Sequence, residues 1–208
     1  MIVTGAGGGL GSIAVAILAN LGHTVVASTG RASKLEGYLK ELGATRVIGR
    51  LTDGADGPPP VLGKQLWSGA IDTVGGSTLV ALTSQMKYRC AVASTGVAGG
   101  GELEGTVYPF ILRGVRLLGV DSTLPVSCDG YDAEDNAEHT AERLEIWRRL
   151  SSDLPVETLR KIWRGDSSSD SGDGGRVIAL EEVGEWSERL LRGEVQGRVV
   201  VKVSEERE

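Results

Sequence analysis

The chain has 208 residues, a net charge of −6 and 40% hydrophobic residues, which suits one domain with its own core, or one domain with an appendage. No dense Lys/Arg run is present, so we expect no nucleic-acid partner. Neither a signal peptide nor an apolar run of the roughly 18 residues that a membrane helix needs is visible. We therefore expect a cytoplasmic protein that binds no membrane. Cys90 and Cys128 form neither a disulfide framework nor a metal site, so we expect no metal and a reducing compartment.

Short apolar runs alternate with helical segments over the first 120 residues. The runs predict buried strands, because apolar residues follow one another instead of alternating with polar ones. These strands lie at residues 2–4, 24–27, 46–48, 70–72, 90–93 and 115–120. The helical segments lie at residues 12–21, 34–42, 78–86 and 107–112. This alternation predicts an α/β fold with a doubly wound parallel sheet of the Rossmann type.

The character of the chain changes after Asp121. Residues 127–139 are acidic and polar, and the low complexity of residues 165–175 predicts disorder. We predict C-terminal helices at 141–150 and 180–192 and a final strand at 198–203. The chain therefore divides into a dinucleotide-binding domain, residues 1–122, and a C-terminal segment with helices, polar insertions and the final strand, residues 123–208.

A glycine-rich loop, residues 6–11 (AGGGLG), separates the first strand from the first helix. It is a variant of the dinucleotide fingerprint, in which glycine lets backbone N–H groups at a helix N-terminus approach a pyrophosphate. We expect Gly8 and Gly9 to face the pyrophosphate and Gly11 to let the helix approach the strand. The alternative is a glycine turn in another α/β fold, but the strand before and the helix and strand after the loop favour a dinucleotide site.

The end of the second predicted strand indicates which cofactor binds. An NAD enzyme often places a carboxylate there, whereas this chain has Ser28, Thr29 and Arg31, with Lys34 nearby. Hydroxyl groups and a guanidinium fork suit the 2′-phosphate of NADPH. The alternative for Arg31 and Lys34 is a solvated helix start. Arg50, after the third strand, is interpreted either as a residue over the adenine or as a surface charge.

We expect structural roles for several other residues. Asp72 ends the fourth strand, and His23 and His139 have no partner at a catalytic or metal-binding spacing. Tryptophans such as Trp147 and Trp163 fall on helical stretches and are expected to pack. No catalytic residue can be assigned from these patterns.

Six stretches carry a resemblance to a known family: VTGAGGGLGSIAVAIL, VVASTGR, WSGAIDTVGG, ASTGVAGG, YPFILRGVRLLGVDS and QGRVVVKV. With them the chain resembles the medium-chain dehydrogenase/reductase superfamily, in its zinc-independent acrylyl-CoA reductase and quinone oxidoreductase branch. The resemblance implies NADPH-dependent reduction of an activated carbon–carbon double bond, as in an enoyl-CoA, or of a quinone-like substrate. It also implies a GroES-like substrate domain before the nucleotide-binding domain. That N-terminal domain is absent here, so we expect a truncated form; the alternative is a non-catalytic NADP-binding or interaction module.

The resemblance also implies roles for residues of this sequence. Gly8, Gly9 and Leu10 would hold the pyrophosphate. Thr29, Gly30 and Arg31 would hold the 2′-phosphate. The nicotinamide end would lie near Val97, Ile111 and Ser122, with Gln196 as a weaker candidate. The strand at 115–120 would pair with its copy in a second subunit, so we expect a homodimer.

Overall fold

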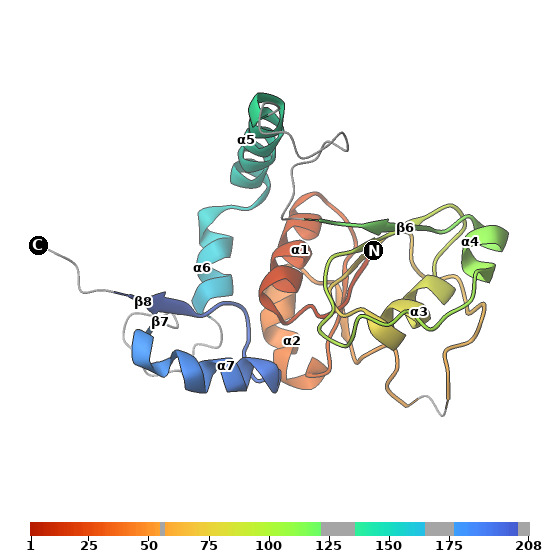
Figure 1. Ribbon diagram of the computed structural model, residues 1–208, viewed down its shortest axis with the longest axis horizontal. Helices are drawn as coiled ribbons and strands as arrows, with labels where there is room; N and C mark the ends of the chain where they lie inside the picture. Colours follow the sequence, from red (N-terminus) through yellow and green to blue (C-terminus); the bar gives the residue numbers. More distant parts are fainter. Residues whose placement is uncertain (55–56, 122–135, 165–176, 204–208) are drawn as a thin grey trace, which may run out of the picture.

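The computed structural model describes residues 1–54, 57–121, 136–164 and 177–203. Its main sheet contains β1 (Ile2–Val3), β2 (Val26–Ser28), β3 (Arg46–Ile48), β4 (Ala70–Asp72), β5 (Ala91–Ser94) and β6 (Arg116–Gly119). These strands all pair in parallel, in the order β3-β2-β1-β4-β5-β6 (Figure 1). The predicted doubly wound parallel sheet is therefore confirmed. The strand order reverses between β1 and β4, and ligands of such sheets bind in the crevice at this point.

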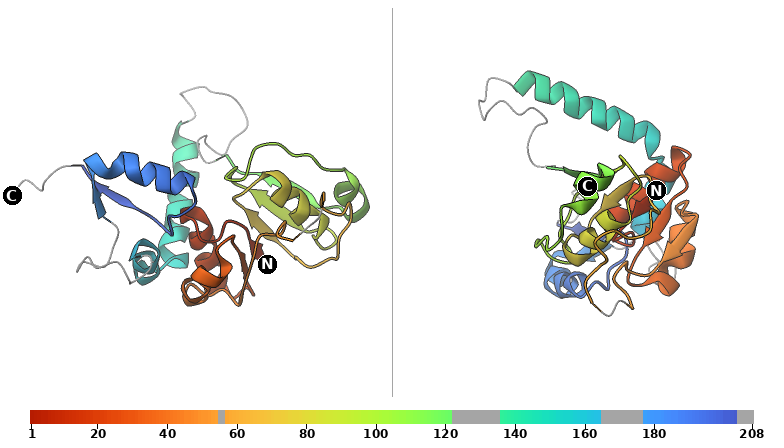
Figure 2. Two further views of the ribbon diagram at one scale, coloured as in Figure 1. Left: turned by 90° about the horizontal axis from the view of Figure 1, so that it is seen from below. Right: turned by 90° about the vertical axis from the view of Figure 1, so that its right-hand side faces the viewer.

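Helices cover both faces of this sheet (Figure 2). On one face, α1 (Gly9–Asn20) and α2 (Ala32–Glu41) pack on a core that includes Val3. On the other face, α3 (Gly76–Ser84) and α4 (Tyr108–Arg113) pack on a core that includes Ile2. Neither Ile2 nor Val3 is exposed to solvent. Adjacent side chains of a strand point to opposite faces, so burial on both faces explains why the strands have no polar alternation.

Within residues 136–164 and 177–203, the C-terminal part adds four further helical elements and two strands. They are α5 (Asn136–Asp153), α6 (Val156–Arg164), β7 (Val177–Ala179), the 3-10 helix η2 (Leu180–Glu182), α7 (Val183–Leu191) and β8 (Val200–Lys202). Strands β7 and β8 pair in parallel and form a separate small sheet. Residues 165–175, for which the sequence predicts disorder, lie outside the described residues.

Two of these C-terminal helices relate differently to the main domain. Helix α6 joins its core, because Leu154 and Ile162 are buried in the same cluster as Val15 of α1. Helix α5 stands away from the rest of the molecule in Figures 1 and 2. The expectation that Trp147 of α5 is a packing residue is wrong, since its side chain is 64% exposed. The physical reason is that α5 projects from the core instead of lying on it.

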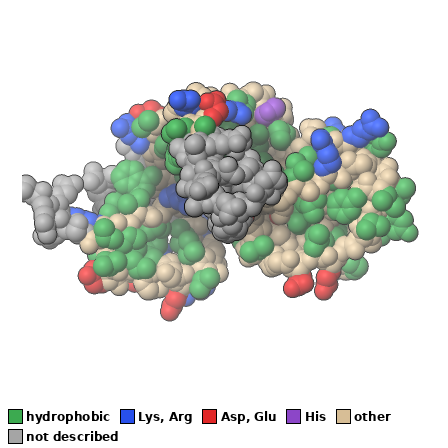
Figure 3. Space-filling view, turned by 45° about the horizontal axis from the view of Figure 1, so that its top comes forward, with side chains coloured by type: hydrophobic (Ala, Val, Ile, Leu, Met, Phe, Trp, Pro, Cys, Tyr) green, Lys and Arg blue, Asp and Glu red, His purple; other side chains and the backbone are tan. Residues whose placement is uncertain are grey.

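The surface agrees with the charge pattern of the sequence. On the face shown in Figure 3, Lys and Arg side chains occur in small groups, some of them beside Asp and Glu. Hydrophobic side chains occur toward both ends of this face. Ile111 of α4, Leu118 of β6 and Val120 after it are about half exposed or more. Among the helices that the structure describes, none combines the length and the apolarity needed to cross a bilayer.

Candidate functional site

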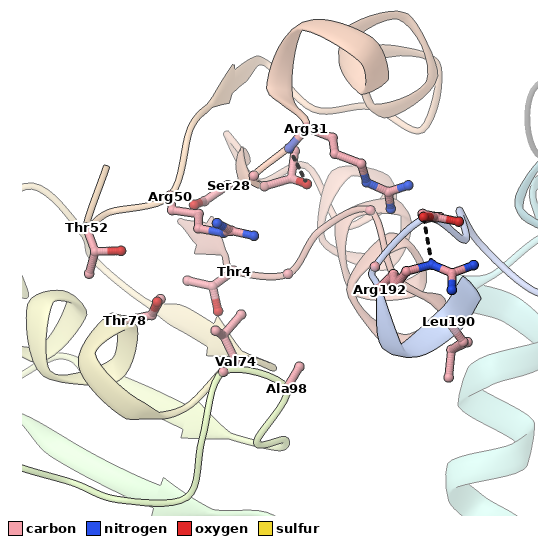
Figure 4. Close-up of a pocket in the computed structure, with 18 of the residues that line it drawn as sticks. Thr4, Ser28, Arg31, Arg50, Thr52, Val74, Thr78, Ala98, Leu190 and Arg192 are labelled. Atoms are coloured by element: carbon pink, nitrogen blue, oxygen red, sulfur yellow. Dashed lines mark hydrogen bonds and ion pairs between the residues drawn. The ribbon is translucent and has the colours of Figure 1, made fainter. Parts of the chain in front are cut away.

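A cleft of about 650 Å³ opens at the carboxyl ends of β1, β2 and β4, where the strand order reverses. Its walls come from four regions: the glycine-rich loop, the loops after β2 and β3, the loops after β4 and β5, and the end of α7 (Figure 4). The side chains of Arg31, Lys34, Arg50 and Arg192 line it, together with the carboxylate of Glu194. Cations thus outnumber carboxylates among the described lining residues, which suits an anionic ligand.

The N-cap residue of α1 lies at one edge of this cleft, next to the first turn of the helix. Gly8 is the N-cap residue, no side chain caps the helix there, and no acidic residue lies in its first turn. The N–H groups and the positive end of the helix dipole therefore remain available for a phosphate. A methyl group on Gly11 would lie 2.8 Å from the Ala6 Cα. Gly11 therefore lets α1 begin against the loop that follows β1, and the approach of the helix to the strand itself stays a prediction.

A C-terminal strap, residues 195–198, crosses the glycine-rich loop. The Gly197 N–H donates to the Gly7 carbonyl over 3.1 Å, and Arg31 Nη2 donates to the Val195 carbonyl over 2.8 Å. The Arg198 guanidinium covers Gly9, since a Cβ on Gly9 would lie 2.6 Å from Arg198 Nε. Arg198 therefore belongs to the site, although the sequence analysis assigned it no role.

The polar residues after β2 make the second edge. Ser28 is 2% exposed, and its hydroxyl already donates to the Gly49 carbonyl over 2.9 Å. Gly30 lets Arg50 lie against the end of this strand, because a Cβ there would be 2.7 Å from the Arg50 Cζ. Both predicted cations, Arg31 and Arg50, thus reach the same cleft from neighbouring loops.

Asp72 holds the loops around the cleft together and does not line it. Its buried carboxylate accepts from Thr4 Oγ1 over 2.6 Å and from the Gly75 N–H over 2.8 Å. The Thr4 bond joins the ends of β1 and β4 across the sheet, and the Gly75 bond fixes the loop that follows β4. The structural role that the sequence predicts for Asp72 agrees with this geometry.

We therefore expect Asp72→Asn to lower the free energy of unfolding by about 1–3 kcal/mol, because one buried charge-assisted hydrogen bond is lost and an amide N–H₂ faces another donor. Urea unfolding followed by circular dichroism would measure the change. A variant with the same midpoint and slope as the parent would show that the carboxylate adds nothing to the loops it joins.

The structure brings half of the predicted site residues into the cleft lining: Gly8, Ser28, Thr29, Gly30, Arg31 and Arg50. Gly9, Leu10 and Gly11 form the adjoining first turn of α1 without lining the cleft. Val97 precedes Ala98, which does line it, whereas Ile111 lies on α4 and is 67% exposed. Ser122 lies outside the described residues. Gln196 is buried in the strap, and its Nε2 has no hydrogen-bond partner among the described residues.

Other lining residues were not identified from the sequence. Thr52, Val74, Ser77, Thr78, Ala98 and Gly99 follow β3, β4 and β5, so strand ends in a doubly wound sheet are a signal that could have found them. Residues 190–194 at the end of α7 also line the cleft. Nothing in their local pattern indicates a site, because they reach it only through the tertiary fold.

The chain is similar in sequence to known dehydrogenases and reductases. A family model described as zinc-binding dehydrogenase matches residues 9–130. Acrylyl-CoA reductase AcuI of Ruegeria pomeroyi is 41% identical over 204 residues, which cover 98% of this chain and 54% of the relative. The chain thus spans about half the length of the curated relatives it matches.

Two solved structures are similar over the same part. The yhdH oxidoreductase of Salmonella enterica in complex with NADP is 41% identical, with a TM-score of 0.76 over 98% of this chain and 54% of that one. The yhfP protein of Bacillus subtilis with NAD bound is 44% identical, with a TM-score of 0.75 over 97% of this chain and 54% of that one. One relative was thus crystallised with NADP and the other with NAD.

Proposed function

This chain belongs to the zinc-binding dehydrogenase family, in the acrylyl-CoA reductase and quinone oxidoreductase branch of the medium-chain dehydrogenase/reductase superfamily, and from this premise we propose that it is the nucleotide-binding part of an NADPH-dependent oxidoreductase. The observation that carries the proposal is the cleft itself. It joins the uncapped N-terminus of α1 to Arg31, Lys34 and Arg50 at the ends of β2 and β3. Hydroxyls and cations stand where an NAD enzyme often has a carboxylate.

Each part of the site has a proposed role in holding the cofactor. Gly8, Gly9 and Leu10, with Arg198 above them, hold the pyrophosphate, and the donors are the N–H groups of Gly9 and Leu10, because the Gly8 N–H already donates to the Gly5 carbonyl. Thr29, Gly30 and Arg31 hold the 2′-phosphate, and Arg50 lies over the adenine. The residues proposed for the nicotinamide end are Val97, Ile111 and Ser122. When bound, NADPH supplies the hydride.

The proposed reaction class follows from the relatives' names. It is reduction of an activated double bond, as in acrylyl-CoA, or of a quinone, and in either case negative charge develops on the substrate oxygen. No residue of this chain is assigned as the donor that stabilises this charge. The contribution that we propose for the chain is to bind and orient the cofactor.

Zinc does not fit the described part of the chain. Within residues 1–54, 57–121, 136–164 and 177–203, no three His, Cys, Asp or Glu side chains come together as a metal site. We therefore derive no step through a metal. Cys90 is a free thiol, which suits the reducing cytoplasm that we propose as the location of the protein.

Titration of the purified chain with NADPH and NADH, followed by cofactor fluorescence, tests the proposed function. NADPH is expected to bind more tightly, because a cationic β2 end attracts the 2′-phosphate that NADH lacks. The preference is also expected to shrink at high salt, since part of it is electrostatic. Equal dissociation constants for the two cofactors would contradict the choice of NADPH, and binding of neither would contradict the proposed function.

We further propose that β6 pairs with its copy in a homodimer. This strand ends the main sheet, and Leu118 on it is 49% exposed. Such an edge presents unpaired backbone groups to another chain. Leu118→Lys is expected to convert a dimer to a monomer at micromolar concentration, measured by light scattering. Leu21→Lys, at a similarly exposed leucine after α1, is the control and should leave the dimer intact. A monomeric parent chain would contradict the proposal.

A further inference from the structure

Arg192 enters the cleft from an element far from β2 in the sequence. It directly follows α7, and its side chain lines the same cleft as Arg31. Figure 4 shows both guanidinium groups on the same side of the cleft. The cleft that contains the cation at the end of β2 is therefore lined by a second guanidinium, contributed by the C-terminal segment.

Two glutamates hold Arg192. Its Nε lies 2.9 Å from Glu194 Oε1, and its Nη1 lies 3.6 Å from Glu188 Oε2. The side chains of Arg192 and Glu194 are 54% and 48% exposed. An ion pair this open to solvent is weak. A stronger anion can therefore displace the carboxylate at low cost.

Arg31 is already partly engaged without a ligand. Its Nη2 donates to the carbonyl of Val195, the residue that follows Glu194. A 2′-phosphate carries about −1.5 to −2 charges and three acceptor oxygens, so the single positive charge of Arg31 does not balance it. Arg192 offers further donors from the same chain segment that binds Arg31.

We propose that Arg192 and Glu194 determine specificity for a 2′-phosphorylated nucleotide. Arg192 is a second ligand of the 2′-phosphate, and Glu194 is a resident carboxylate that the phosphate displaces from it. The inference rests on the proposed function, because it assigns these residues to the same cofactor cleft. It predicts effects of opposite sign when the two charges are removed one at a time.

The test measures dissociation constants for NADPH and NADH, and for two nicotinamide-free probes that differ only in the 2′-phosphate, adenosine 2′,5′-bisphosphate and adenosine 5′-monophosphate. Arg192→Gln should weaken binding of the two 2′-phosphorylated ligands about tenfold, which corresponds to about 1.4 kcal/mol. Glu194→Gln should strengthen it by about threefold, because a like charge beside the phosphate is removed. Neither variant should change binding of NADH or the monophosphate by more than about twofold.

Arg160→Gln is the matched control. It removes one positive charge from a second half-exposed arginine that pairs with a glutamate, Glu157, outside the cleft lining. If Arg192→Gln behaves like this control, or weakens NADH equally, the inference is wrong while the proposed function stands. If the parent chain binds none of the four ligands, both are wrong. Circular dichroism of each variant confirms that binding differences do not come from unfolding.

Discussion

The Gly11→Ala variant is expected to lose about 3 kcal/mol of unfolding free energy, because the added methyl group enters a contact between two backbone segments. An alanine Cβ there would lie 2.8 Å from Ala6 Cα, closer than real Cβ atoms come to backbone atoms. Helix α1 would have to move away from β1, so the N–H groups at its first turn would also shift. Binding of NADPH and of NADH should therefore fall together.

Gly37→Ala is the matched control, since it makes the same chemical change within a helix. Gly37 lies in α2, and a Cβ there would meet no atom within 4 Å. This variant should gain about 0.5–1 kcal/mol, because alanine favours the helix over glycine. Urea unfolding of the two variants gives both values. Equal stability of the two would show that the contact at Gly11 relaxes without cost, and that the close approach of α1 is not what requires glycine.

Arg31→Ala is expected to raise the dissociation constant of NADPH roughly 10- to 150-fold, or about 1.5–3 kcal/mol. The guanidinium makes charge-assisted hydrogen bonds to the 2′-phosphate, and NADH has no group in that place. The affinity for NADH should therefore change little. Titration by cofactor fluorescence measures both constants on the same samples.

A second substitution separates charge from packing at this position. Arg31 also donates to the Val195 carbonyl, so alanine removes a bond to the strap as well as the positive charge. Arg31→Gln retains an N–H₂ donor for that carbonyl while removing the charge. It should weaken NADPH nearly as much as alanine does. If glutamine restores parent affinity, or if NADH weakens in parallel, Arg31 acts by positioning the strap and not by contacting phosphate.

The sequence was sufficient to predict the first half of the fold and the centre of the site. The mostly apolar runs at residues 2–4 and 24–27 overlap β1 and β2, whose residues are all buried, because a strand buried on both faces leaves this signal. The glycine-rich loop was also predictable, since all its parts are adjacent in the chain. Its Gly8 N–H to Gly5 carbonyl bond is likewise local, whereas its bond to Gly197 is not.

The remaining parts depend on contacts between distant residues. Arg198 covers Gly9, and Arg192 lines the same cleft as Arg31, although more than 150 positions of sequence separate the members of each pair. No motif spacing can therefore reveal these residues. Strand β7 has only three residues and directly follows a segment of low complexity. It was not predicted, because this segment forms a strand only by pairing with β8.

The strap makes the glycine-rich loop and the small β7–β8 sheet parts of one thermodynamic system. Residues 195–198 bond to the loop through Gly7 and Arg31, and the chain continues from there into β8. A change that stabilises or destabilises the pairing of β8 must therefore change the affinity of the glycine-rich loop for its ligand. By reciprocity, a ligand bound at the loop must stabilise that pairing by the same free energy. The Gly197 amide, whose hydrogen bond to Gly7 joins the two, can report this coupling through its rate of hydrogen exchange.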